Sequence, residues 1–254
     1  MRDAKKNFNT SAKNVIRTQL FQVAAKKTKK VCNALMMPAR ECLCIKEALR
    51  VGLFTTDTNI VAIESDWNSA QEIQKELQRL GFKNFSVINK ELIKVTAHDL
   101  KRRLCKPSKG LGRLYKFLNS TDVRFDFVYL DLMGTPSKGT EGWLAWKLTE
   151  VIRWSTPVAM TYYNADRTNN LLGRHPDWSY KFSDRWDTNY NSEKAANMTI
   201  EALSKVGKNR IVKYGRAYKN SRQAVPMVTF LTGYGLKQKP ETHKSFAYDL
   251  GYKK

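Results

Sequence analysis

Two acidic residues each follow a run of apolar residues, at places where an α/β protein binds its ligands. The run Phe125–Leu130 is the clearest strand pattern in the chain and leads into Asp131, and Ile60–Ile63 leads into Glu64. In open α/β sheets, ligands bind beyond the carboxyl ends of the strands. We therefore expect both carboxylates to face a ligand site. For Asp131 the alternative is a cap on the helix that follows.

The residues after Asp131 support a site at this strand end. Gly134 allows the backbone to approach a ligand closely, and Pro136 pre-sets the turn. A carboxylate there can orient a nucleophile or take its proton. Tyr162, at the end of another strand-like run, would border the same cleft and could stack a base. The alternative is that Tyr162 faces the core.

The elements that position these residues alternate between apolar, strand-like runs and amphipathic, helix-like runs. This pattern is typical of a parallel sheet covered by helices. The expected strands are Val31–Met37, Ile60–Ile63, Asn84–Ile88, Phe125–Leu130 and Val158–Tyr163. The expected helices are Ala39–Val51, Ser69–Leu80, Ala97–Leu104 and Gly139–Trp154.

The pattern changes after the fifth strand. A long polar and aromatic stretch leads to a helix over Asn191–Val206 and then to an antiparallel pair, Arg210–Ala217 with Val225–Thr232. The fold class predicted is α/β: a Rossmann-like, mostly parallel sheet with helices on both faces and a C-terminal antiparallel hairpin. The domain would span residues 31–236, with an inserted loop at 164–190, a basic helix or arm at 1–30 and a basic tail at 237–254.

The net charge points to a polyanionic partner. The 254 residues hold 45 Lys and Arg against 23 Asp and Glu, a formal charge of +22. Such a field attracts nucleic acid or an anionic membrane. We find no lipidation motif, no signal peptide and no apolar run long enough to span a bilayer. The expected partner is therefore RNA or DNA, within a nucleic-acid-processing assembly, and the expected location is the cytoplasm. Small size and richness in Asn and Lys suit a phage or viral protein.

Three regions mix cations with aromatic residues, as surfaces that contact phosphates and stack bases do. They are the N-terminal helix, the inserted loop and the hairpin. A solvated helix face or a loop pinned by buried tryptophans would have a similar composition. The candidate nucleic-acid-binding residues are Lys26, Lys27, Arg167, Arg174, Trp178, Arg185, Trp186, Lys213 and Arg216.

The cysteines and histidines predict no metal site. Cys32, Cys42, Cys44 and Cys105 lack the paired spacing of zinc ligands, and the three histidines are far apart in the chain. Free thiols in a reducing compartment are the simplest interpretation.

The strand order and the two acidic strand ends resemble the class I S-adenosylmethionine-dependent methyltransferases. The resemblance spans roughly residues 30 to 235 and lies in Val61–Asp66 and Phe125–Pro136. It implies S-adenosylmethionine as cofactor, with Glu64 accepting hydrogen bonds from the ribose hydroxyls and Asp66 as a second candidate or a helix cap. Asp131 would contribute to the cofactor site and stand at the reaction centre.

The loop after the first strand departs from the family. The family has a glycine-rich loop there, whereas this chain has Pro38 and Ala39 and no glycine between Ala34 and Glu41. A Pro-Ala turn can still lead into a helix whose N-terminus faces a ligand. Pro38 and Ala39 are therefore the expected cofactor contacts of this loop.

Two functions remain open. The first is a methyltransferase acting on RNA or DNA, and the alternative is a non-catalytic nucleic-acid-binding protein on a methyltransferase-like fold, in a replication, transcription or virion assembly. The turn after Asp131 departs from the Asn/Asp-Pro-Pro-aromatic motif of the DNA amino-methyltransferases, and no Pro-Cys dipeptide provides a thiolate nucleophile. Neither G-x-G-x-x-G nor a Walker A motif is present, which disfavours other nucleotide-binding enzymes.

Overall fold

The computed structural model describes residues 11–28, 30–104, 123–132, 138–163, 197–207, 210–218 and 227–234. Within these residues, seven strands form one sheet in the order β3-β2-β1-β4-β5-β7-β6. The strands are β1 Asn33–Met36, β2 Asn59–Glu64, β3 Phe85–Asn89, β4 Phe127–Asp131, β5 Val158–Tyr163, β6 Arg210–Tyr218 and β7 Met227–Tyr234.

The sheet is parallel from β3 through β5 and antiparallel at its last two strands. β1 pairs with both β2 and β4, and β5 pairs with β4 on one side and antiparallel with β7 on the other. β6 completes the hairpin with β7. The predicted Rossmann-like sheet with a C-terminal antiparallel hairpin is confirmed.

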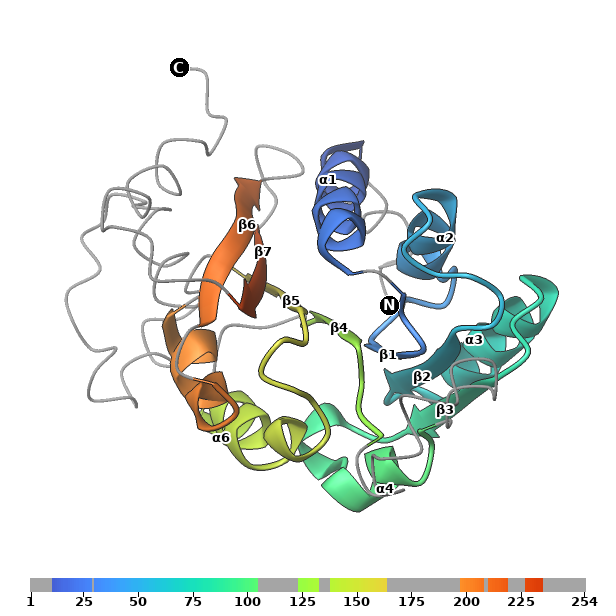
Figure 1. Cartoon of the computed structure of the whole chain (residues 1–254). Helices are drawn as coiled ribbons and strands as arrows, with labels where there is room; N and C mark the ends of the chain where they lie inside the picture. The colour runs from blue at the N-terminus through green and yellow to red at the C-terminus, as the bar shows by residue number, and fades with distance from the viewer. Residues whose placement is uncertain are drawn as a thin grey trace, which may run out of the picture.

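Helices cover both faces of this sheet, because its strands are apolar on both sides. Figure 1 shows α1 (Ser11–Lys27), α2 (Leu43–Arg50) and α3 (Trp67–Arg79) on one face, and α4 (Ala97–Lys101) and α6 (Lys138–Trp146) on the other. Successive residues of a strand point to opposite faces. Met36 thus packs in the core under α1–α3, and Leu35 packs in the core under α4 and α6.

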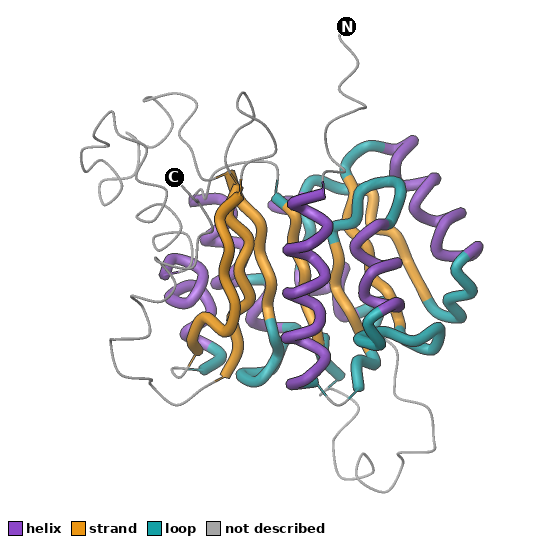
Figure 2. Tube along the Cα trace, turned by 90° about the horizontal axis from the view of Figure 1, so that it is seen from above, coloured by secondary structure: helices purple, strands orange, loops and turns teal. Residues whose placement is uncertain are grey.

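Helix α1 is part of the α/β domain and not a separate arm over the residues described. Leu20, Phe21 and Ala24 are fully buried, and the Phe21 ring meets Tyr129 edge-to-face at 5.5 Å. The helix layer that contains α1 lies over the strands in Figure 2. Within the predicted basic helix or arm at residues 1–30, Ser11–Lys27 thus forms a helix whose apolar side completes the core on the sheet.

Two predicted helices have different limits. The helix expected over Ala39–Val51 begins only at Leu43, because Cys42 has a left-handed backbone with φ 51° and cannot continue a helix backwards. The helix expected over Gly139–Trp154 ends at Trp146 and is followed by a 3-10 turn, Leu148–Glu150. The helix expected from Asn191 is described over 197–202 and passes into the 3-10 turn Leu203–Lys205.

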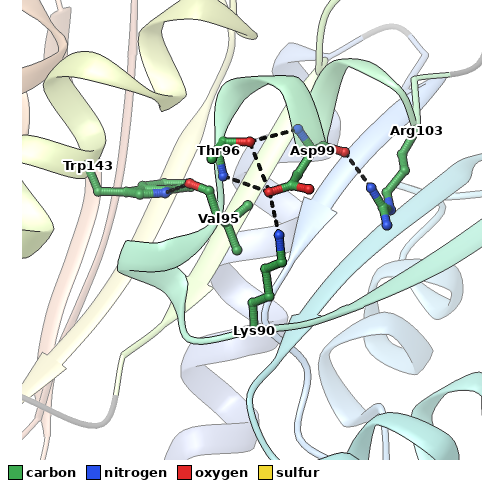
Figure 3. A network of polar contacts seen from close by, with 6 residues as sticks. All are labelled: Lys90, Val95, Thr96, Asp99, Arg103 and Trp143. Atoms are coloured by element: carbon green, nitrogen blue, oxygen red, sulfur yellow. Dashed lines mark hydrogen bonds and ion pairs between the residues drawn. The ribbon is translucent and has the colours of Figure 1, made fainter.

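A polar network fixes the short helix α4 in place (Figure 3). Thr96 accepts a hydrogen bond from the Asp99 amide while the Asp99 carboxylate accepts one from the Thr96 amide, a reciprocal cap. Lys90 bonds the same carboxylate, and the Trp143 indole of α6 donates to the Val95 carbonyl at 2.9 Å. Helix α4 is thereby tied both to β3 and to α6.

Candidate active site at the carboxyl edge of the sheet

The register of the sheet brings the two predicted carboxylates into one row. Met36 of β1 is level with Ala62 of β2 and with Tyr129 of β4. Glu64 and Asp131 each lie two residues further along, so they are level with each other on either side of the β1 end. Two strand spacings separate them, roughly 10 Å. Both have the same parity as Met36 and point to the face that carries α1.

The row continues as polar residues onto the neighbouring strands. Asn89 is the partner of Glu64, and Thr161 is the partner of Asp131. The Thr161 and Thr229 hydroxyls are 2.9 Å apart and buried. A polar band therefore crosses the carboxyl edge where the strand interiors are apolar.

Asp131 is held by a lysine that reaches down from α1. Lys13 Nζ lies 2.7 Å from Asp131 Oδ2, with 10% of the lysine side chain and 15% of the aspartate side chain exposed. The second carboxylate oxygen, Oδ1, is buried and makes no hydrogen bond with the described residues. A buried carboxylate oxygen without a donor is costly, so the site is suited to a ligand that supplies one.

A second buried cation lies one turn further along α1. Arg17 is 7% exposed and donates a hydrogen bond to Asn14 at 2.8 Å. Burial alone would lower the pKa of Arg17, but Tyr129, Cys44 and Asp131 together raise it. The guanidinium therefore stays charged and adds to the field around Asp131. Lys13 and Arg17 are the residues of this site that sequence analysis missed. The available signal was their spacing of four residues, which places the two side chains on one face of a helix.

Glu64 and Asp66 have different roles. Glu64 is half-buried at the end of β2, and its Oε1 accepts a hydrogen bond from the Asp66 amide at 2.9 Å. Asp66 caps α3 through the Ser69 amide, and this bond lowers the pKa of the Asp66 carboxyl. Between the two alternatives for Asp66, the geometry is that of the helix cap.

The loop after β1 is fastened at both ends. The Met37 amide donates to the Tyr129 carbonyl, and the Cys42 amide donates to the Ala39 carbonyl at 2.8 Å. Pro38 is buried and Ala39 is exposed. Cys42, buried and at φ 51°, takes the left-handed conformation that glycine would adopt without strain. The loop thus turns sharply without a glycine and presents Ala39, a small side chain, at its outer surface.

Tyr162 faces the core rather than the cleft. Its side chain is fully buried in the cluster under α4 and α6, and its ring stacks on Phe230 with centroids 6.1 Å apart. Burial raises the pKa of the Tyr162 hydroxyl. This geometry gives Tyr162 a packing role, and the prediction of a catalytic one has no support from its position.

The predicted nucleic-acid-binding residues divide into three groups. Lys26 is exposed near the end of α1, and Lys213 is half-buried on β6. Lys27 and Arg216 lie within α1 and β6, but their side chains are outside the described residues. Outside the described residues altogether are Arg167, Arg174, Trp178, Arg185 and Trp186.

Neither a metal cluster nor a membrane span is found in the part of the chain that the structure describes. No group of three His, Cys, Asp or Glu side chains there could hold an ion. No described helix is long and apolar enough to cross a membrane. Cys32, Cys42 and Cys44 are free thiols.

Comparison with solved structures identifies the fold. The N-methyltransferase NodS from Bradyrhizobium japonicum WM9 is similar over 87% of this chain and 96% of that chain, with a TM-score of 0.51 and 8% sequence identity. Its complex with S-adenosyl-L-homocysteine aligns over 89% of each chain with the same TM-score and identity. An O-methyltransferase from Bacillus cereus, also in complex with S-adenosylhomocysteine, aligns over 90% of this chain and 83% of that chain at 10% identity, with a TM-score of 0.49.

By sequence, no family model matches the chain, and no curated protein matches it either. The likeness is therefore one of architecture. The chain has the fold of the class I S-adenosylmethionine-dependent methyltransferases, with a carboxylate at the end of β2 and another at the end of β4.

Proposed function

We propose that this protein is an S-adenosylmethionine-dependent methyltransferase that acts on nucleic acid. The observation that carries the proposal is the polar row at the carboxyl edge, with Glu64 and Asp131 level on either side of β1 and a buried Asp131 oxygen that makes no hydrogen bond with the described residues. The fold is shared with NodS, which has been crystallised with S-adenosyl-L-homocysteine.

The residues at this edge fit the cofactor. Glu64 would accept hydrogen bonds from the ribose hydroxyls, a task that needs a carboxylate at a strand end. Ala39, exposed and small, would let the backbone of the first loop approach the ligand. The cofactor, when bound, supplies an electrophilic methyl group on a sulfonium.

The buried ion pair between Lys13 and Asp131 would orient and deprotonate the acceptor. Lys13 lies 2.7 Å from Asp131 and fixes its side chain in place, so the carboxylate can accept a hydrogen bond from a hydroxyl or amino group of the acceptor. That bond would orient the nucleophile, and Asp131 would accept its proton. The cofactor would supply the methyl group and leave as the neutral thioether once its sulfur–methyl bond breaks. Alignment and exclusion of water account for much of the expected rate enhancement.

The charge of the chain supports nucleic acid as the acceptor. A formal charge of +22 is far above what solubility requires and favours a polyanion. The free thiols of the described cysteines suit a cytoplasmic reaction, where RNA and DNA are accessible.

The second candidate is a non-catalytic nucleic-acid-binding protein. It is favoured by the glycine-free first loop and by the Lys13–Asp131 ion pair, which a purely structural role would also explain. The two candidates differ in cofactor binding, because a methyltransferase must bind S-adenosylmethionine and a non-catalytic scaffold need not.

Transfer of a labelled methyl group tests the proposal. The full-length protein is incubated with S-adenosylmethionine carrying a tritiated methyl group and with single-stranded RNA, double-stranded RNA or DNA. We expect label in a nucleic acid with the wild type and a loss of at least about tenfold with Asp131→Asn. Glu91→Gln, which removes an exposed carboxylate of a surface ion pair, is the matched control. If the protein binds the cofactor but labels no nucleic acid, the proposal that nucleic acid is the methyl acceptor is contradicted. If it does not bind the cofactor, the non-catalytic nucleic-acid-binding protein is favoured.

A further inference from the structure

A pocket of about 500 Å³ lies at the opposite edge of the sheet from Asp131. It is bounded by the end of α1, the turn before β5 and the β6–β7 hairpin. In the parallel strands this is the amino edge, so the length of a strand, on the order of 15–20 Å, separates it from the polar row. The pocket therefore does not belong to the candidate active site.

Two aromatic side chains form one wall of this pocket. Trp154 is 50% exposed and Tyr234 is 43% exposed, and their rings meet edge-to-face with centroids 4.3 Å apart. Gly207 lies close against the tryptophan, since a Cβ atom on Gly207 would come within 2.8 Å of the Trp154 Cβ. A side chain at position 207 would therefore force Trp154 to move.

Cations outnumber acids around the aromatic wall. Lys30, Arg153 and Lys213 line the pocket, and Asp126 is the one acid among its described lining residues. The Asp126 charge is already engaged. Its Oδ2 accepts the amides of Cys32 and Asn33, and its Oδ1 lies 3.5 Å from Arg153.

A buried arginine adds positive charge below the turn. Arg210 is 4% exposed and donates to the carbonyl oxygens of Thr156 at 2.9 Å and Trp154 at 3.3 Å. Its Nε makes no hydrogen bond with the described residues, and none of its described hydrogen bonds is to a carboxylate. Burial lowers the pKa of Arg210 to about 10, so it remains charged at neutral pH. Arg210 itself does not line the pocket, but Trp154, Thr156 and Thr232, to which it donates hydrogen bonds, do. Its charge therefore adds to the positive potential behind the pocket wall.

We propose that this pocket binds a segment of single-stranded nucleic acid, with a base stacked on Trp154 and the backbone phosphates on Lys30 and Lys213. Exposed aromatic rings flanked by cations are the arrangement that binds unpaired bases irrespective of sequence. Lys26, exposed near the end of α1, extends the cationic surface. The proposal rests on the nucleic-acid part of the proposed function and adds a docking site remote from the methyl transfer.

Binding of fluorescein-labelled oligo(U) and oligo(dT) octamers to the full-length protein, followed by anisotropy, tests the aromatic wall. Stacking of one base predicts that Trp154→Ala weakens binding at least about fivefold, with a smaller loss for Tyr234→Ala. Trp146→Ala is the matched control, since Trp146 is 65% exposed on α6 away from the pocket. Equal affinities for the wild type and both pocket variants would overturn the proposal.

The cations are tested in the same assay. We expect Lys30→Gln and Lys213→Gln each to weaken binding and to reduce its dependence on salt, while Lys75→Gln on the exposed face of α3 leaves both unchanged. Unlabelled octamer should displace the probe far better than uridine monophosphate or inorganic phosphate. Equal displacement by the mononucleotide would contradict a strand as the ligand, and loss of octamer binding in the Lys75 variant alone would contradict the site.

Binding of S-adenosylhomocysteine by these variants separates this proposal from the proposed function. Pocket variants that bind the cofactor product as the wild type does, but bind octamers weakly, support a distinct docking site. If the pocket variants bind octamers as the wild type does, the proposed docking site is overturned, even if these variants bind S-adenosylhomocysteine.

Discussion

The carboxyl and amino edges of the sheet differ in the charge that they present. At the carboxyl edge, Glu64 and Asp131 are acids at strand ends, and the cation nearest to Asp131 is Lys13, buried against it. At the amino edge, Lys30 and Lys213 surround an exposed tryptophan, and the one described acid of the pocket is occupied by backbone amides and Arg153.

The difference indicates two ligands of opposite character. A carboxylate edge suits a ligand with hydroxyl donors and positive charge, as the proposed cofactor has, whereas a cationic and aromatic edge suits a strand of nucleic acid. The excess of positive charge in the sequence does not by itself distinguish the two edges. The structure shows how the positive charge is distributed, because two cations of α1, Lys13 and Arg17, are buried near the acidic residues of the carboxyl edge.

The largest effect is expected from breaking the buried pair at the carboxyl edge. Lys13→Met leaves Asp131 buried without its cation, and we expect a loss of about 3 kcal/mol in the free energy of unfolding. Urea denaturation measures it. Lys46→Met is the control, because its ion pair with Glu76 is more exposed and should be worth less than about 1 kcal/mol. The double change Lys13→Met with Asp131→Leu should recover most of the loss, and no recovery would contradict a paired charge.

A change that alters only the shape of the amino edge should come next. Gly207→Ala places a Cβ against Trp154, and we expect about 1–2 kcal/mol of destabilisation together with displacement of the indole. Thermal unfolding and tryptophan fluorescence measure the two effects. Gly142→Ala, where an added Cβ meets nothing within 4 Å, is the control. An unchanged fluorescence spectrum in the Gly207 variant would show that the glycine does not position Trp154.

A change away from both edges should lower stability without affecting either ligand. Thr96→Ala removes half of the reciprocal cap of α4 and should cost about 1 kcal/mol. Binding of octamer and of S-adenosylhomocysteine should stay at wild-type affinity. Selective loss of one ligand would mean that α4 supports one edge more than the other.

The polar network of Lys90, Thr96 and Asp99 at α4 makes a smaller, pH-dependent contribution to the free energy of unfolding. The Thr96 amide, with the Lys90 ammonium and the Thr96 hydroxyl, holds the pKa of Asp99 well below its ordinary value. A carboxyl whose pKa is lower in the folded state stabilises the fold above its ordinary pKa near 4, and this stabilisation is lost as the pH falls below that value. The stability difference between wild type and Asp99→Asn should therefore shrink between pH 5 and pH 2.5. A constant difference in urea midpoints across that range would contradict this assignment.

Much of the fold could be predicted from the sequence, since apolar strands and amphipathic helices alternate clearly. The β5 limits, Val158–Tyr163, agree residue for residue with the prediction, and β2 extends the prediction by one residue at each end. Glu64 and Asp131 were placed at strand ends for the same reason. The start of α2 could not be predicted, because a left-handed cysteine has no sequence pattern that distinguishes it from a helical one.

The parts of the site that depend on tertiary contacts were beyond the sequence. Lys13 and Arg17 were assigned to a solvated or nucleic-acid-binding arm, since nothing local shows that α1 lies over Asp131. The sequence did not decide whether the Tyr162 side chain points into the core or into the cleft, because a residue at a strand end can do either. Trp154 was placed in a helix, and its exposure beside Tyr234 follows from the meeting of segments 80 residues apart.

Isothermal titration of the full-length protein with S-adenosylhomocysteine, for the wild type and for Glu64→Ala, tests the central claim most directly. We predict binding by the wild type and a loss of at least about tenfold in the variant, because two hydrogen bonds to the Glu64 carboxylate would be removed. Glu91→Gln should bind as the wild type does. No heat of binding with the wild type, or equal affinity in the Glu64 variant, would contradict a cofactor site at the carboxyl edge.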